Sequence, residues 1–158
     1  MDYKSKIEET GHERLLRCGI RPSVQRLAVM NYLMENRVHP TVDKIFSDLY
    51  PSMPTLSRTT VYNTLKLLVE SGAAIMLTID EKNTRFDAET KPHTHFMCNK
   101  CGVVTDLNIN PPILKGNYID ECEILNSELY LYGYCPECTK RNKNLKKNNK
   151  LINKQFKT

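Results

Sequence analysis

Apolar residues recur at helical spacing through about the first 70 residues of the chain and predict four helices. Capping residues and helix breakers set their ends, as with Gly19, which can stop the first helix, and Ser57, which can cap the last. The segments expected to be helical are residues 4–18, the stretch from Ser23 to Asn36, the stretch from Thr41 to Pro51, and residues 58–71.

The fourth predicted helix has two unlike faces. One is an apolar stripe of Val61, Leu65, Leu68 and Val69 at helical spacing, which should face a core. The other face is polar and consists of Arg58, Thr59, Tyr62, Asn63 and Lys66. The segments 74–79 and 84–87 then predict two strands joined by a turn. Helices followed by a hairpin are the order of a winged helix-turn-helix, whose last helix enters the major groove of DNA.

From residue 92 onward the pattern changes to short apolar strands. We expect strands over 95–98 and 103–107, a short helix over 113–121 and a long strand over 123–132. The predicted fold class is therefore α+β, with an N-terminal winged helix-turn-helix domain followed by a small α/β domain. The expected boundaries are 1–86 for the first domain, 87–138 for the second, and 139–158 for a basic, disordered tail.

Composition and charge narrow the function. The chain is 40% hydrophobic and 26% charged, which is typical of a globular protein. No apolar run approaches the roughly 18 residues that span a bilayer, and the N-terminus does not resemble a secretion signal, so we expect a cytoplasmic protein without a membrane partner. The net charge of +5 is uneven, because residues 139–158 carry eight Lys or Arg and no acid. Residues 87–138 are acidic, which favours cation binding there.

Four of the six cysteines form two C-x-x-C pairs, Cys98 with Cys101 and Cys135 with Cys138. Without an export signal, such pairs favour metal binding over disulfides. Four thiolates can surround Zn²⁺ as a closed tetrahedron, which gives a structural rather than a catalytic site. The alternative, a redox-active pair, lacks the βαβ context of thioredoxin-like motifs.

A second candidate site consists of Asp87, His93, His95 and Asp106. Residues 93 and 95 point to the same face of a strand, because side chains alternate along it. Two imidazoles with carboxylates form a mixed nitrogen and oxygen ligand set that suits Fe(II), Mn(II) or Zn(II). A lone histidine is more often an ordinary surface or core residue, as we read His39 from its position alone.

The polar face of the fourth helix can be assigned to DNA contacts. Arg58 can reach guanine or phosphate, Asn63 can pair with adenine, and Tyr62 can touch a thymine methyl group. Thr59 shares this face, and Lys66 is suited to phosphate. An amphipathic helix alone is weak evidence, but the predicted wing and the basic tail favour DNA binding.

Residues 10–138 together resemble the ferric uptake regulator (Fur) family. The resemblance rests on specific segments rather than on composition. These are Arg21 to Arg26 (RPSVQR), Thr60 to Leu65 (TVYNTL), Ser71-Gly72, Arg85 to Asp87 (RFD), His93 to Gly102 (HTHFMCNKCG) and Leu131 to Cys138 (LYGYCPEC).

The resemblance implies a homodimeric, metal-dependent transcriptional repressor. Its first domain would bind a pseudo-palindromic double-stranded DNA operator, and its second would dimerise. The resemblance also adds His39 to the second candidate site, since the family's sensing site takes one ligand from this place in the DNA-binding domain. The implied regulatory site for Fe²⁺ or Mn²⁺ is His39, Asp87, His93, His95 and Asp106.

Two features resemble the peroxide-sensing branch of this family. Asp stands at positions 87 and 106, where iron-sensing members more often have Glu, and Tyr62-Asn63 is also similar to that branch. Residues 125–128 contain no His, so a third metal site is not expected. The resemblance implies that peroxide, reacting at bound iron, oxidises His39 or His93 and so releases the DNA.

Three other functions are alternatives. The first is an iron- or zinc-responsive repressor on the same scaffold. The second is a hydrolytic enzyme using the His/Asp site, which lacks a convincing general base and a pocket-forming segment, so we expect no enzyme. The third is a zinc-binding interaction module whose helical region binds another protein.

Overall fold

The computed structural model describes residues 9–109, 111 and 116–141. The chain divides into two compact units, residues 1–91 and residues 92–158, which are taken separately below. Asp87, expected to open the second domain, ends a strand of the first unit in this division.

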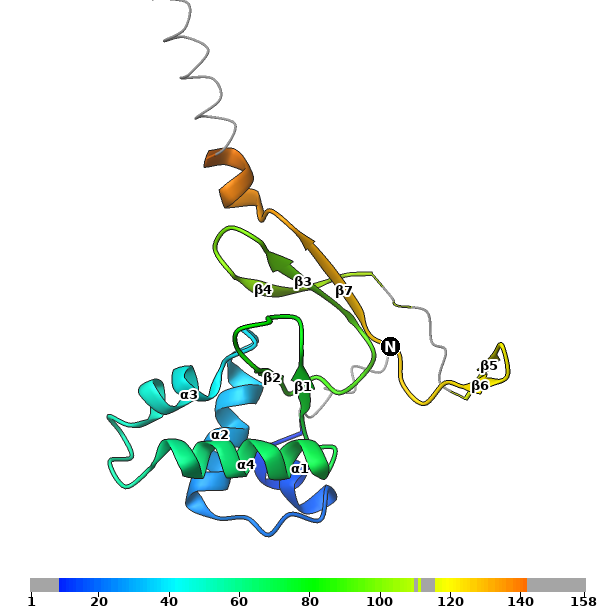
Figure 1. Ribbon diagram of the computed structural model, residues 1–158. Helices are drawn as coiled ribbons and strands as arrows, with labels where there is room; N and C mark the ends of the chain where they lie inside the picture. The colour runs from blue at the N-terminus through cyan, green and yellow to red at the C-terminus, as the bar shows by residue number, and fades with distance from the viewer. Residues whose placement is uncertain (1–8, 110, 112–115, 142–158) are drawn as a thin grey trace, which may run out of the picture. The chain divides into compact units, whose positions relative to one another are not determined.

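The first unit contains four helices followed by a hairpin (Figure 1). The helices are α1 (Gly11–Arg17), α2 (Val24–Glu35), α3 (Val42–Leu49) and α4 (Arg58–Glu70). The last three begin at the expected caps, since Ser23, Thr41 and Ser57 each accept a hydrogen bond from a first-turn backbone N–H. This order of helices and hairpin is the winged helix-turn-helix predicted from the sequence.

The first helix starts later than predicted. It begins at Gly11, because Thr10 accepts a hydrogen bond from the backbone N–H of Glu13 while the Glu13 carboxylate binds the Thr10 backbone, which is a complete capping box. The expectation of helix from residue 4 is therefore wrong at residues 9 and 10, and residues 1–8 lie outside the described part of the chain.

The four helices enclose one core. Leu15, Leu33, Ile45 and Leu65 from successive helices are all fully or nearly fully buried in it. In α4 the expected stripe is confirmed. In α2, Val24 is 77% exposed at the helix start, while Val29 and Met30 are buried further along.

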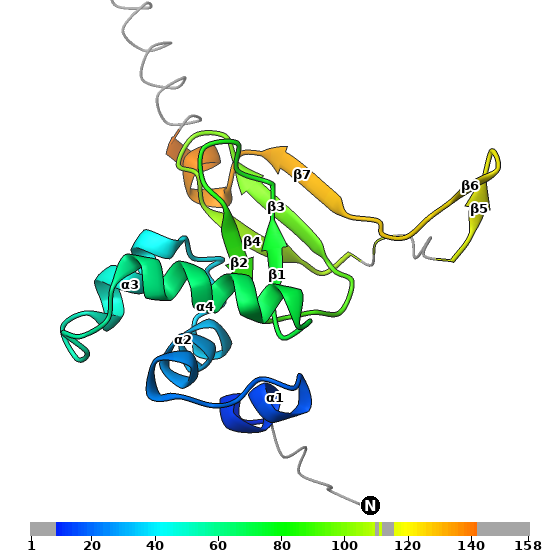
Figure 2. The same ribbon diagram turned by 60° about the horizontal axis from the view of Figure 1, so that its bottom comes forward.

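The hairpin follows α4 directly. Gly72, at φ +70°, takes the left-handed conformation that ends the helix, and β1 (Ile75–Leu77) then pairs antiparallel with β2 (Arg85–Asp87). The backbone N–H of Phe86 donates to the Pro40 carbonyl at 3.1 Å, which ties β2 to the loop between α2 and α3. Figure 2 shows this hairpin at the end of α4.

The second unit is built on a three-stranded sheet of order β4-β3-β7. Here β3 (Thr94–Cys98) pairs antiparallel with β4 (Val104–Leu107) and parallel with β7 (Leu129–Gly133). A separate two-stranded hairpin, β5 (Tyr118–Ile119) and β6 (Cys122–Glu123), projects away from this sheet in both ribbon views.

Two predictions in the second unit are wrong. Residues 116–121 do not form the expected helix, because Asp120 and Glu121 take left-handed backbone conformations in the tight turn between β5 and β6; residues 112–115 lie outside the described residues. The long strand expected over 123–132 is interrupted, since only its ends fall in β6 and β7. Short alternating runs cannot distinguish one strand from two.

The C-terminal part of the described chain is a helical turn over residues 136–141. The rest of the predicted tail, residues 142–158, lies outside the described residues. Across the described residues, no helix has the length and apolar character needed to cross a bilayer.

Candidate metal sites and nucleic-acid interface

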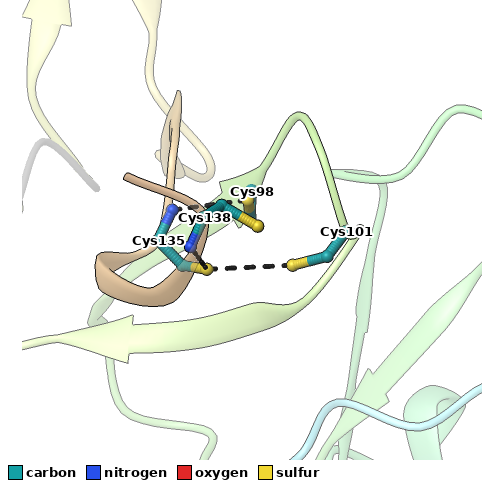
Figure 3. Close-up of side chains that lie close together, drawn as sticks. All are labelled: Cys98, Cys101, Cys135 and Cys138. Atoms are coloured by element: carbon teal, nitrogen blue, oxygen red, sulfur yellow. Dashed lines mark hydrogen bonds between the residues drawn. The ribbon is translucent and has the colours of Figure 1, made fainter. Parts of the chain in front are cut away.

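The four paired cysteines gather at one end of the second unit's sheet (Figure 3). Cys98 ends β3, Cys101 lies in the turn toward β4, and Cys135 and Cys138 come from the turn and helix after β7. One sulfur from each residue lies within 4.8 Å of all the others. Parallel pairing of β3 with β7 brings the two C-x-x-C segments together, because Cys98 lies opposite Gly133 in the register.

Local hydrogen bonds and burial shift the pKa values of two of these thiols in opposite directions. The backbone N–H of Cys135 donates to the Cys98 sulfur at 3.3 Å, and with further turn amides it lowers the pKa of that thiol to about 6. Burial, together with the neighbouring sulfurs, raises the pKa of Cys138 to about 12. As thiolates, four sulfurs this close would repel one another unless a cation lay between them, so the cluster fits a tetrahedral divalent ion.

In the first unit, His39 and Asp87 form a buried pair. The His39 Nε2 atom lies 3.5 Å from the Asp87 Oδ2 atom, and both side chains are less than a tenth exposed. The other carboxylate oxygen of Asp87 accepts the backbone N–H of Glu89 at 2.9 Å, which fixes the direction of the carboxylate. An unprotonated imidazole nitrogen and a carboxylate oxygen both offer lone pairs, so their mutual approach suits a shared cation.

In the second unit, His93, His95 and Asp106 form a second group. Oδ1 of Asp106 lies 3.3 Å from His93 Nε2 and 3.8 Å from His95 Nε2. The two imidazole rings are 4.2 Å apart between centroids, which confirms that residues 93 and 95 share a face. Asp106 reaches them because it lies opposite His95 in the β3–β4 pair, and the ring of Tyr130 on β7 packs edge-on against His95.

The polar face of α4 is exposed along its length. Arg58, Thr59, Tyr62, Asn63 and Lys66 are all exposed, while Val61, Leu65 and Leu68 on the other side are buried. A hollow of about 530 Å³ lies between this helix and the hairpin, with Tyr62, Lys66 and Lys82 in its walls. The residues expected to contact DNA therefore share one accessible surface.

Comparison of the sequence with models of protein families identifies the family of this chain. A family model described as the ferric uptake regulator family matches residues 17–126. The chain belongs to this family.

Similar proteins cover nearly the whole chain. A peroxide-responsive repressor PerR of Staphylococcus epidermidis is 31% identical over 143 residues, which are 85% of this chain and 95% of that protein. One of Staphylococcus aureus is 32% identical over 142 residues, 84% of this chain and 96% of that protein. A solved ferric uptake regulator of Francisella tularensis with iron has a TM-score of 0.60 at 20% identity, covering 77% and 96% of the two chains, and supports the fold.

In this ferric uptake regulator family member, Arg58 also contacts two residues of α3 that the sequence pattern does not indicate. The Arg58 guanidinium forms an ion pair with Asp43 on α3 at 2.8 Å and lies 4.4 Å from the centre of the Phe46 ring. The helical spacing places residues 43 and 46 on successive turns, but only the packing of α3 against α4 brings them to Arg58. Arg58 is thus held by its own domain in the absence of DNA.

Proposed function

We propose that this protein is a metal-dependent, DNA-binding transcriptional repressor that responds to peroxide. The observation that carries the proposal is the division of a His/Asp ligand set between the two units: His39 and Asp87 on the DNA-binding unit, and His93, His95 and Asp106 on the other. One Fe²⁺ or Mn²⁺ ion bound by all five would restrain the angle between the units. Zn²⁺ would occupy the four-cysteine site as a permanent structural ion.

The restraint would act on DNA through a homodimer. Two copies of α4, held at a fixed separation, match two half-sites of a pseudo-palindromic operator. Strand β7 supports self-association, because it ends the β4-β3-β7 order of the described sheet and carries Tyr132, which is 54% exposed. An edge strand of this kind can pair with its copy. Regulating operators in this way would place the protein in the cytoplasm.

The α4 surface would supply the contacts to the operator. Asn63 and Tyr62 can reach base edges, Thr59 and Lys66 can meet the backbone, and Arg58 can exchange the Asp43 carboxylate for a phosphate or guanine. Both members of that ion pair are more than half exposed, so the exchange costs little.

The peroxide response would use the same site. Bound Fe²⁺ would supply the reducing chemistry for hydrogen peroxide. His39 or His93 would gain one oxygen atom on a ring carbon while the second oxygen leaves as water. The modified imidazole no longer binds well, so the restraint on the two units is lost. Two similar family members that are named peroxide-responsive repressors support this interpretation.

Metal dependence is tested by a gel shift on a duplex selected from a random library with the Mn²⁺-loaded protein. We expect Mn²⁺ to tighten DNA binding by 1–3 kcal/mol, about 5–150-fold, and His39→Ala to lose this effect. His12→Ala is the matched control, because His12 is an exposed residue of α1. Mn²⁺-independent DNA binding by the unmodified protein would contradict the proposal.

Peroxide sensing is tested by mass spectrometry of the Fe²⁺-loaded protein after peroxide treatment. We expect one added oxygen on the peptide that contains His39 or His93, none in the Mn²⁺-loaded protein, and reduced sensitivity in Asp106→Glu. Metal-dependent DNA binding without this oxidation would instead indicate an iron- or zinc-responsive repressor.

A further inference from the structure

We propose that Arg14 and Arg85 are positioning residues for the His39–Asp87 pair, each holding a backbone carbonyl at or beside one of these two ligands. The inference rests on the proposed function, since it concerns the ligand pair of the first unit. All the contacts that carry it lie within that unit.

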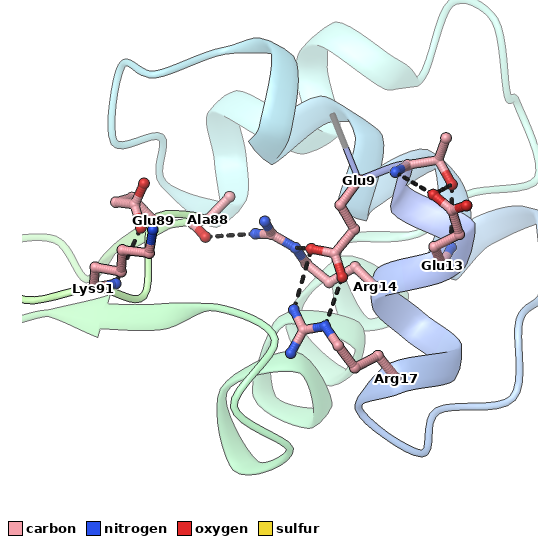
Figure 4. A network of polar contacts seen from close by, with 8 residues as sticks. Glu9, Glu13, Arg14, Arg17, Ala88, Glu89 and Lys91 are labelled. Atoms are coloured by element: carbon pink, nitrogen blue, oxygen red, sulfur yellow. Dashed lines mark hydrogen bonds and ion pairs between the residues drawn. The ribbon is translucent and has the colours of Figure 1, made fainter. Parts of the chain in front are cut away.

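The first positioning contact acts on the Asp87 side. Arg14 on α1 donates from Nη1 to the Ala88 carbonyl at 2.6 Å, across 74 positions of sequence. Its Nε atom donates to Glu9 at 2.8 Å, so the guanidinium is anchored at its other edge (Figure 4). Glu9 also accepts from Arg17, at 2.6 Å and 3.1 Å, but Arg17 bonds no atom of the 87–91 segment in Figure 4.

This contact controls the direction of a ligand. The Asp87 carboxylate is oriented by the backbone N–H of Glu89, so its geometry depends on the conformation of residues 87–89. Arg14 holds the carbonyl in the middle of that segment. A cavity of about 710 Å³ has Arg14, Asp87 and Ala88 in its walls. Truncating the Arg14 side chain would therefore enlarge an existing space.

The second positioning contact acts on His39. This residue has φ +48°, a left-handed conformation that is strained for a non-glycine residue, and it precedes a proline, where the backbone is further restricted. Arg85 on β2 donates from Nη1 to the His39 carbonyl at 3.3 Å, and it is anchored by Asp80 at 2.9 Å and 3.1 Å. The Phe86 N–H binds the next carbonyl, that of Pro40.

The two contacts follow one design. In each, a mostly buried arginine is fixed by a carboxylate and donates another N–H, from Nη1, to a main-chain oxygen of the ligand segment. Groups that orient metal ligands without touching the ion typically change metal affinity by about 10–100-fold when removed. Asp80 and Arg85 also belong to the β1–β2 hairpin. Their side chains therefore connect this hairpin to the backbone of His39.

The test measures Mn²⁺ affinity of the full-length, zinc-loaded protein by calorimetry. We expect Arg14→Ala and Arg85→Ala each to weaken Mn²⁺ binding by about 10–100-fold. Arg17→Ala is the matched control, because it also removes an arginine that is paired with Glu9. It should change Mn²⁺ affinity by less than about 2-fold. If Arg14→Ala does not fold, Glu9→Gln replaces it, and Asp80→Asn serves likewise for Arg85.

A second readout separates positioning from general damage. At saturating Mn²⁺ the two variants should bind DNA as tightly as the unmodified protein, because the excess ion restores the occupied site. A DNA-binding defect that persists at saturation would show a structural role and overturn the inference. Equal Mn²⁺ affinities for Arg14→Ala and Arg17→Ala would overturn it too, whereas failure of the unmodified protein to bind Mn²⁺ through His39 would overturn the proposed function itself.

Discussion

The two metal-ligand sets differ in how the chain supplies them. The four cysteines all belong to one unit, where a turn and a parallel strand pair bring their sulfurs together. The His/Asp set comes from both units, two ligands from one and three from the other. A ligand set within one unit stabilises that unit, whereas a divided set can report on the relation between units. If the proposed function holds, the four-cysteine set is suited to permanent zinc binding and the His/Asp set to regulation.

The largest effect should follow from opening the cysteine site. Cys98→Ser should abolish stoichiometric zinc and unfold the β4-β3-β7 sheet, because a structural zinc site contributes about 10–16 kcal/mol of binding free energy to the folded state. Zinc analysis and circular dichroism measure both. Cys122→Ser is the control, since Cys122 is exposed and outside the cluster. A folded, zinc-free Cys98→Ser protein would remove the contrast between the two sites.

The stability of the first unit should depend on its helical core and not on bound zinc or manganese. Leu65→Ala should destabilise this unit by about 2–5 kcal/mol, because Leu65 is fully buried between the helices, while zinc content stays the same. Tyr62→Ala, on the exposed face of the same helix, should change stability by less than about 0.5 kcal/mol and weaken DNA binding. Denaturant unfolding compares the two, and equal losses would mean that the faces of α4 are misassigned.

Removing a ligand of the divided set should leave the fold intact. Loss of a group that only orients a ligand typically weakens metal binding by about 10–100-fold. Asp106→Ala should weaken Mn²⁺ binding by at least this much, because a direct ligand is lost. Its melting temperature without Mn²⁺ should match that of the unmodified protein, since Asp106 is partly exposed at the sheet surface. Calorimetry and thermal unfolding check these values. Unfolding on the scale of Cys98→Ser would contradict a regulatory role.

The smallest expected effect is the pH dependence of the stability that Glu9 contributes. Hydrogen bonds from Arg17 and Arg14 hold the pKa of Glu9 at about 2, against burial that acts to raise it. Because the folded-state pKa is depressed, the contribution of Glu9 is present above about pH 4.5 and is lost as the pH falls toward 2. Hydrogen exchange of the α1 amides should therefore show a difference between the unmodified protein and Glu9→Gln that shrinks as the pH falls from about 5 toward 2. A constant difference would contradict the pairing.

Much of the fold could be predicted from the sequence, for identifiable reasons. Helices α2 to α4 carry their own caps, and the apolar stripe of α4 is complete, so local signals sufficed. The failures lie where local signals are weak. The capping box at Thr10 lies inside the longer stretch 4–18 whose spacing predicts one helix, and the turn at Asp120 and Glu121 requires left-handed backbone that composition does not reveal.

The candidate sites were only partly within reach of sequence reasoning. The cysteine pairs and the His93–His95 spacing are local patterns, so they could be recognised directly. His39 needed the family resemblance, because its approach to Asp87 depends on β2 binding the loop after α2. Arg14 gave no signal, since its contact with Ala88 joins distant parts of the chain.

Paramagnetic broadening by Mn²⁺ tests most directly whether one ion binds ligands from both units at once, as we propose. One equivalent of Mn²⁺ is added to the ¹⁵N-labelled, zinc-loaded protein, and amide signals are followed around residues 39 and 87 and around residues 93–95 and 106. The account predicts that both groups broaden together and that His39→Ala strongly reduces the broadening in both. Broadening confined to one unit, or unchanged in His39→Ala, would contradict it.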